Sequence, residues 1–380
     1  MSDVVVVGGG IVGLACAYEL AARGARVTLL EHGKTGMQAT NAAAGMLAPI
    51  IEARAPGPML DAGIEALDAY PALAERLERE AGFGLELRLD GILRVAYDDD
   101  AGALRDRFRW MRGLDDAVHW VDAETCRELE PRLSPRVAAG IVSEREGSVS
   151  NQLVALALER GALARGAYVR QRAPVMGWVR RAGRVVAVRT PDGDVAADIF
   201  VLAAGARSGQ LSRPLACRLP VEPVRGQMIA IGGMVTPIRR VVWGPEGYLV
   251  PRANGLIFAG ATVEHVGFRR RTTRAAVRRL RAMAVRLVPQ LRAGVVHFEW
   301  AGLRPGTPDD LPIVGPLPGD ANVIAATGHY RNGILLGPWT GERVARGVVD
   351  GDWSGVPVAF RPERFAERVM LSRSAAAPHR

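Results

Sequence analysis

The stretch Val4-Val5-Val6-Val7-Gly8-Gly9-Gly10-Ile11-Val12-Gly13 decides the fold of this chain. A β-branched run passes directly into glycines, and a helical pattern follows over 14–23. Gly24 is a typical helix stop, and residues 25–30 predict a second strand. A strand–helix–strand unit with glycines at this spacing is the dinucleotide-binding fingerprint. The alternative interpretation is a glycine-rich turn that holds no ligand.

Each glycine of the fingerprint has its own physical reason. Gly8 permits a tight turn, Gly10 lets the backbone approach a pyrophosphate, and Gly13 lets helix and strand pack closely. The phosphate is expected at the positive end of the helix. Glu31, at the end of the second strand, is placed to accept hydrogen bonds from the ribose hydroxyls, and its charge disfavours the 2'-phosphate of NADP.

The fingerprint alone does not choose between FAD and NAD. Its position within the first residues of the chain is usual for FAD proteins. The segment 198–206, Asp-Ile-Phe-Val-Leu-Ala-Ala-Gly-Ala, predicts a buried strand that ends in a glycine turn and returns to the same sheet. Without its context, this segment is equally well an ordinary core strand.

Length and composition limit the remaining possibilities. The chain has 380 residues, of which 48% are hydrophobic and 23% charged, so we expect two or three globular domains and no coiled coil. No apolar run is long enough to span a membrane. Three widely separated cysteines fit neither a disulfide framework nor a metal site, and no secretory signal is expected. These features predict a cytoplasmic protein.

The net charge of +9 raises the question of nucleic-acid binding. Lys34 is the only lysine, so the charge is almost entirely arginine and indicates a compositional bias. The densest stretch, 269–292, has apolar residues at helical spacing and no interleaved aromatic residues. We therefore expect a solvated amphipathic helix rather than a phosphate-binding one, and no nucleic-acid partner.

Three further segments contain candidate functional residues. The small residues of 40–49, Thr-Asn-Ala-Ala-Ala-Gly-Met-Leu-Ala-Pro, allow close packing against a flat ring, although a plain alanine-rich helix is an equal alternative. Arg304 and Arg331 each stand among glycine and hydrophobic residues near the C-terminus. A guanidinium held on a short rigid segment suits a small carboxylate, because its planar fork donates two parallel hydrogen bonds. The alternative for either arginine is a surface ion pair.

Together these segments resemble the D-amino-acid oxidase family of FAD-dependent amine oxidases. The resemblance spans residues 4 to about 350 and rests on the fingerprint, 42–49, Pro223–Met228, Gly247–Arg252, Gly260–Glu264, Gly302–Pro305 and Gly328–Ile334. It departs from the family pattern at Asn41, where serine or tryptophan is expected, and in the unusually basic stretch 265–271.

The resemblance implies an activity and a set of site residues. It implies non-covalent FAD and oxidative deamination of glycine and related small amines by hydride transfer, with oxygen as acceptor. Among the catalytic residues it implies, Arg304 clamps the substrate carboxylate, Tyr248 donates to it, and Arg331 and Met46 lie beside it. The cofactor-binding residues expected are Gly8, Gly10, Ile11, Val12, Gly13, Glu31, His32, Thr40, Ala44, Gly45, Met46, Val175, Gly205, His329, Asn332, Gly333, Ile334 and Leu335.

The expected fold class is α/β: a discontinuous Rossmann-like FAD-binding domain with a second, antiparallel-sheet-rich substrate domain. We assign residues 1–83, 146–220 and 303–371 to the first domain and 84–145 and 221–302 to the second. The basic tail 372–380 is expected to be disordered, and the protein is expected to form a homo-oligomer. Open alternatives are another FAD amine oxidase, a D-amino-acid dehydrogenase of the same fold, and a non-catalytic flavin-binding subunit.

Overall fold

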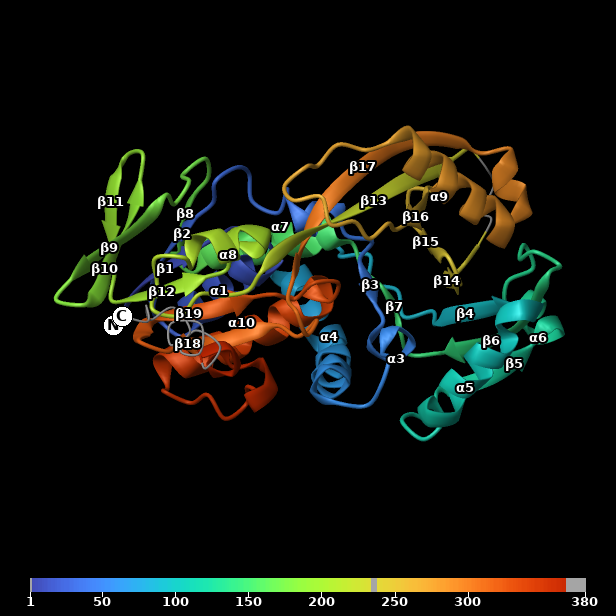
Figure 1. The fold of residues 1–380 in the computed structure, drawn as a ribbon, viewed down its shortest axis with the longest axis horizontal. Coiled ribbons are helices and arrows are strands. Elements are labelled where there is room, and N and C mark those ends of the chain that lie inside the picture. Colours follow the sequence, from blue (N-terminus) through green and yellow to red (C-terminus); the bar gives the residue numbers. More distant parts are fainter. Residues whose placement is uncertain (1, 234–237, 367–380) are drawn as a thin grey trace, which may run out of the picture.

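Two sheets at opposite ends of an elongated molecule dominate the computed structural model, which describes residues 2–233 and 238–366 (Figure 1). One sheet contains parallel strands from both halves of the chain, and the other is mainly antiparallel. This arrangement confirms the predicted fold class. The tail 372–380 lies outside the described residues, and the domain boundaries proposed from the sequence stay a prediction.

The first sheet is built around the N-terminal fingerprint. Within the described residues its strand order is β18-β19-β12-β1-β2-β8. β1 pairs in parallel with β2 on one side and with β12 on the other, so the strand order reverses at β1. Ligands bind open α/β sheets at such a switch point, outside the carboxyl ends of the strands. The strands are β1 (Asp3–Val7), β2 (Arg26–Leu30), β8 (Tyr168–Arg170), β12 (Ile199–Leu202), β18 (Ile313–Leu317) and β19 (Asp320–Thr327).

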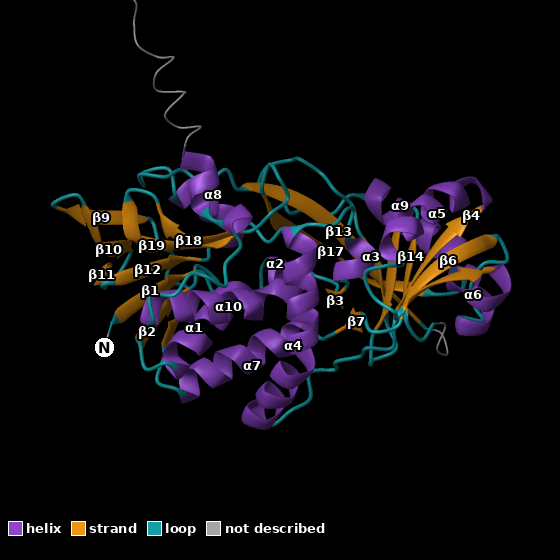
Figure 2. Ribbon diagram, turned by 90° about the horizontal axis from the view of Figure 1, so that it is seen from below, coloured by secondary structure: helices purple, strands orange, loops and turns teal. Residues whose placement is uncertain are grey.

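Four helices form a layer beside this sheet (Figure 2). They are α1 (Ile11–Ala22), α4 (Pro58–Ala81), α7 (Asn151–Ala164) and α10 (Gly333–Val349). α1 and α10 approach closely, because a Cβ on Gly341 would lie 2.6 Å from the backbone carbon of Ala15. Burying these apolar faces stabilises the sheet by roughly 25 cal/mol per Å² of apolar surface. The helical pattern of residues 70–80 predicts only the later part of α4, which starts at Pro58 and passes through Pro71.

The second sheet combines two separate chain segments. Its strand order is β17-β13-β16-β15-β14-β4-β6-β5, with β14 and β4 as a parallel pair. β13 and β17 are long, and both extend back toward the first sheet (Figure 1). The strands are β4 (Ile92–Tyr97), β5 (Val118–Asp122), β6 (Val137–Ser143), β13 (Glu222–Gly232), β14 (Val241–Gly244), β15 (Gly247–Pro251), β16 (Ile257–Gly260) and β17 (Val295–Gly306).

Three helices pack on the second sheet: α5 (Ala101–Met111), α6 (Ala123–Leu129) and α9 (Arg274–Leu287). The sequence has helical patterns over 104–112 and 122–129, which match α5 and α6 closely. α9 is the expected amphipathic helix: Leu280, Met283 and Leu287 are buried, whereas Arg278 and Arg279 are exposed. The strand-like pattern of 85–97 predicts a longer strand than β4, which begins only at Ile92.

Shorter elements complete the described chain. They are α2 (Ala39–Ala42), β3 (Met46–Leu47), α3 (Pro49–Glu52), β7 (Gly147–Ser148), α8 (Ser208–Leu211) and a separate antiparallel sheet of β9 (Gly177–Arg181), β10 (Arg184–Thr190) and β11 (Gly193–Ala196). The 3-10 helices are 98–100, 205–207, 289–292, 358–360 and 362–365. Among the described residues, no helix is both long and apolar enough to cross a membrane.

Candidate active site

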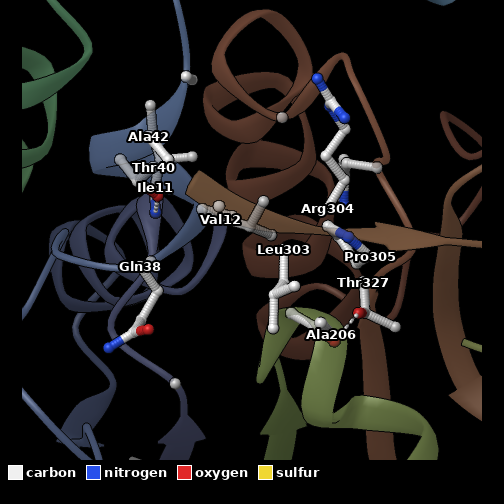
Figure 3. Close-up of a pocket in the computed structure, with 18 of the residues that line it drawn as sticks. Ile11, Val12, Gln38, Thr40, Ala42, Ala206, Leu303, Arg304, Pro305 and Thr327 are labelled. Carbon is white, nitrogen blue, oxygen red and sulfur yellow. Dashed lines mark hydrogen bonds between the residues drawn. The ribbon is translucent and has the colours of Figure 1, made fainter. Parts of the chain in front are cut away.

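One cavity brings together the fingerprint and both candidate arginines. It opens at the carboxyl ends of β1, β2 and β12 and continues to the second sheet, where Arg304 and Tyr248 line it. In Figure 3, Ile11 and Thr40 lie on one side of this cavity, while Arg304 and Thr327 come from separate segments on another. Residues far apart in the sequence therefore share one continuous site.

The fingerprint turn leaves room for a ligand at the start of α1. A Cβ on Gly8 would lie 2.4 Å from the Ala203 oxygen, and one on Gly13 would lie 1.9 Å from the Gly8 oxygen. Gly10 is different, because its nearest neighbour would be the Thr40 hydroxyl at 3.4 Å. Gly8 and Gly13 thus allow close packing, whereas Gly10 and the first residues of α1 line the cavity. The positive end of this helix suits a phosphate group.

At the far end of β2, the carboxylate of Glu31 is buried and firmly oriented. It accepts hydrogen bonds from the backbone N–H groups of Gly9 and Gly33, both at 2.8 Å. His32 and Val175 line the same part of the cavity. A carboxylate has about four acceptor sites, so two amide bonds leave capacity for ribose hydroxyls.

The small-residue segment wraps the cavity without forming a long helix. α2 ends at Ala42, and Gly45 adopts a left-handed conformation with φ of +77°. A Cβ on Gly45 would lie 2.1 Å from the Val149 oxygen, so glycine is required for this close approach. The hydroxyl of Thr40 accepts from the Ile11 N–H at 2.9 Å, and Met46 lines the cavity on the short strand β3.

His329 and the start of α10 close the site from the C-terminal side. The His329 ring is buried, and its Nε2 lies 2.8 Å from the Thr340 hydroxyl. Its Nδ1 has no hydrogen-bond partner within the described chain. Burial lowers the pKa of His329 to about 3, so the ring is neutral near pH 7. Gly205, Gly333 and Ile334 line the cavity nearby.

These features fit a bound FAD. The glycine turn and the start of α1 would hold the pyrophosphate, and Glu31 would hold the ribose. His329 lines the cavity, and its buried Nδ1 has no hydrogen-bond partner among the described residues, so a bound group could supply one. The first backbone N–H groups of α10 meet the cavity at Gly333, where negative charge is favoured.

Arg304 has no acidic partner in the described part of the chain. Its Nη1 donates to the Thr262 carbonyl oxygen at 3.0 Å. The guanidinium lies against the backbone of Gly226, because a Cβ there would lie 2.4 Å from both terminal nitrogens. The Thr262 side chain is itself held by Glu264. This support leaves the remaining N–H groups of Arg304 available for a ligand in the cavity.

Tyr248 lies beside both arginines. Burial raises the pKa of its phenol, and the positive charges of Arg304 and Arg331 act in the opposite direction. The phenol therefore stays protonated near pH 7 and can donate a hydrogen bond. Trp243 packs edge-on against the Tyr248 ring, with 5.3 Å between ring centroids.

Arg331 is paired, unlike Arg304. Its Nε contacts the Glu52 carboxylate, and both side chains are largely buried, at 23% and 19% exposure. Burial alone would lower the pKa of Arg331, but the negative charge of Glu52 raises it. Arg331 is therefore charged, and its contact with Glu52 lies within the cavity wall.

The structure brings the four predicted catalytic residues and most of the predicted cofactor residues to this cavity. Gly13, Asn332 and Leu335 do not line it. Gly13 is covered by the Gly8 carbonyl group, Leu335 is buried in the helical core, and Asn332 precedes α10, where its N–H donates to the His329 oxygen. Sequence reasoning missed Glu52, and it included Thr262 only as part of the segment 260–264 without predicting its contact with Arg304. No local spacing predicts a contact with an arginine far along the chain.

Comparison with known proteins agrees with this geometry. The chain is 37% identical to glycine oxidase of Pseudomonas putida over 337 residues, covering 88% of this chain and 91% of the relative. It is also 37% identical to the bifunctional protein ThiO/ThiG of Synechocystis over 370 residues, covering 96% of this chain but 54% of that relative. The crystal structure of glycine oxidase from Geobacillus kaustophilus superimposes with a TM-score of 0.89, at 31% identity, covering 96% of this chain and 98% of that one.

One protein-family model matches most of the chain. A family model described as FAD dependent oxidoreductase, named DAO, matches residues 3–346. This range includes the fingerprint, Glu52 and both cavity arginines. The chain therefore belongs to the DAO family of FAD-dependent oxidoreductases, and FAD is its cofactor.

Proposed function

We propose that this protein oxidises glycine and related small amines, such as sarcosine and small D-amino acids. The overall reaction converts glycine, oxygen and water into glyoxylate, ammonia and hydrogen peroxide. The observation that carries the proposal is Arg304, a cavity-lining guanidinium supported by a backbone carbonyl group and left without an acidic partner among the described residues. Similarity to glycine oxidases over most of their length supports this assignment.

In this proposal, the protein residues act mainly by positioning the substrate. Arg304 binds the carboxylate through charge-assisted hydrogen bonds, and the Tyr248 phenol donates a further one. FAD supplies the two-electron acceptor, which oxygen reoxidises. Holding reactants in a productive orientation lowers a barrier by up to about 7 to 11 kcal/mol. The start of α10 adds a positive potential for charge that develops in the cavity, at Gly333 and Ile334.

A strong side-chain base is not part of this proposal. His329 is the candidate for such a base, but burial lowers its pKa to about 3. A base is most effective when its pKa lies near the working pH, so neutral His329 is suited to accepting or donating one hydrogen bond instead. We therefore propose that His329 contacts the FAD and does not act as a base.

Anaerobic mixing of the purified yellow protein with glycine is the direct test. We expect the absorption band of the oxidised flavin near 450 nm to bleach, and we expect admitted oxygen to restore it with release of hydrogen peroxide. A panel with sarcosine, proline and D-alanine separates glycine oxidation from other amine oxidation. A flavin that no amine bleaches would point to a non-catalytic subunit, and bleaching with slow reoxidation by oxygen would point to a dehydrogenase.

The cellular setting is a further part of the proposal. We propose that the protein acts in the cytoplasm and supplies the imine of glycine for formation of the thiazole ring of thiamine. Similarity to the ThiO/ThiG proteins supports the pathway, although the chain spans 54% of the Synechocystis relative. We keep the homo-oligomer as a prediction that size-exclusion chromatography with light scattering tests.

A further inference from the structure

The charge balance at the substrate end of the cavity depends on Glu52. Arg304, Arg331 and Glu52 all line the cavity, and the Glu52 carboxylate contacts Arg331 and not Arg304. The charges of Arg94 and Arg107 also act on Glu52, so this carboxylate is the negative group among several arginines. Arg304 is the cavity arginine of this pair that remains for a substrate carboxylate.

Glu52 is held in place by contacts on both sides of α3. The buried carboxyl group of Glu146 accepts from the backbone N–H of Ile50 at 2.5 Å and from that of Ile51 at 3.1 Å. On the other side, Arg94 donates to the Ile51 oxygen at 2.9 Å, and Arg107 donates to it at 2.8 Å. The α3 turn is therefore a rigid support for the Glu52 side chain.

Arg304 and Arg331 both act on the same buried tyrosine. The charges of both act on the Tyr248 phenol. Arg331 also lies over the Trp243 ring, 5.8 Å from its centroid, and Trp243 packs against Tyr248. A small ligand bound at Arg304 is thus within the same compartment as Arg331, and a second carboxylate on that ligand would meet the Glu52–Arg331 pair.

We infer that Glu52 is a specificity-determining residue: by occupying Arg331, it restricts the site to substrates with a single carboxylate. This inference rests on the proposed function. A dicarboxylate would have to compete with Glu52 for Arg331 and would face its negative charge. Glu52→Gln removes that charge while keeping nearly the same shape, so Arg331 becomes available to a second carboxylate.

Two unreactive ligands test the inference without any turnover. Methoxyacetate has one carboxylate, and diglycolate has two, and neither contains an amine that the enzyme could oxidise. Their dissociation constants are measured on the FAD-loaded protein by isothermal titration calorimetry. We expect the wild-type protein to bind methoxyacetate at least about tenfold more tightly than diglycolate. One charged hydrogen bond changes a dissociation constant by roughly this factor.

Glu52→Gln should shift this preference by about tenfold or more toward diglycolate, whereas Glu52→Asp should keep most of the wild-type preference because it keeps the charge. Glu75→Gln is the matched control: Glu75 forms an exposed pair with Arg79 on α4, so its loss should leave the preference unchanged. Flavin content and thermal melting establish that each variant is folded.

A wild-type protein that binds diglycolate as tightly as methoxyacetate overturns the inference, even if Glu52→Gln fails to fold. An unchanged preference in a folded Glu52→Gln protein also overturns it. The proposed function is tested separately with glycine as the substrate. If wild-type protein does not oxidise glycine yet shows the expected ligand preferences, the proposed function is wrong and the charge restriction stands.

Discussion

At the scale of single residues, Arg304 differs from Arg331 in having no acidic partner among the described residues. It donates a hydrogen bond to the carbonyl oxygen of Thr262, and its planar group lies against Gly226. Arg331 shows the contrast, because Glu52 already satisfies its charge. Sequence alone indicated both arginines as candidates, but only the spatial arrangement separates the paired one from the one that remains for a ligand.

Replacing Arg304 by alanine should severely raise KM for glycine while FAD stays bound. Loss of its charge-assisted hydrogen bonds should cost about 3 to 4 kcal/mol, or roughly 200- to 1,000-fold in kcat/KM. Arg304→Lys should recover only part of the loss, because an ammonium group does not make the bidentate contact. Initial rates of peroxide release give these values, and the flavin absorbance gives the FAD content.

The control is Arg79→Ala, which removes an exposed arginine from the surface of α4. It should leave both kinetic constants within about twofold, because exposed ion pairs contribute little. Normal glycine turnover by Arg304→Ala would contradict the assignment of the carboxylate-binding residue.

At the scale of elements, the short helix α3 depends on a buried acid. Glu146 accepts from the N–H groups at the start of α3. Burial raises the pKa of Glu146 to about 8, and these hydrogen bonds only partly oppose the effect. The folded protein therefore keeps this carboxyl group protonated over a range in which the unfolded chain ionises.

The pH dependence of stability follows from this difference. The stabilisation from Glu146 should be complete below pH 4 and should decline as pH rises to about 8, by up to about 1.4 kcal/mol per pH unit. Glu146→Gln has no ionisable group, so its stability relative to wild type should improve over the same range. Urea unfolding of both proteins at pH 5.5, 7.0 and 8.5 measures the difference between their free energies of unfolding. A difference that is constant with pH would refute the raised pKa of Glu146.

The whole molecule explains how much of the fold could be predicted from the sequence. The N-terminal unit was predictable because β1, α1 and β2 are consecutive and their signals are local. α4 was predicted only from residue 70, because Pro71 is a strong helix-breaking signal that packing against α7 and α10 overrides. The three-stranded sheet of β9 to β11 was missed, because much of its surface is polar and its alternation is weak.

The candidate site was predictable to a different degree. Motifs located most of the cavity-lining residues, since a fingerprint fixes its own local geometry. The contacts of Glu52 and Thr262 were not predictable in this way, because each acts on an arginine that only the tertiary fold brings near. Contacts between distant segments are not encoded in any local pattern, and they determine the electrostatics of the site.

The cavity joins both sheets, so FAD should stabilise the molecule as a whole. Each tenfold rise in free FAD above its Kd should add about 1.4 kcal/mol to the free energy of unfolding. Thermal melting of the apoprotein at a series of FAD concentrations measures the effect. FMN should be less effective at equal concentration, because it lacks the adenosine that Glu31 and Val175 are expected to hold. A melting temperature independent of the FAD concentration would contradict the assignment of this cavity as the FAD-binding site.

The close approach of α1 to α10 has a consequence for synthesis of the protein. The two helices belong to opposite ends of the chain, and Gly341 on the later helix lies against Ala15 on the earlier one. Until the ribosome has translated α10, the face of α1 that packs against it remains exposed. The cavity wall at Gly333 and Ile334 is therefore completed late, and nascent chains that stop before residue 333 should leave α1 open to protease.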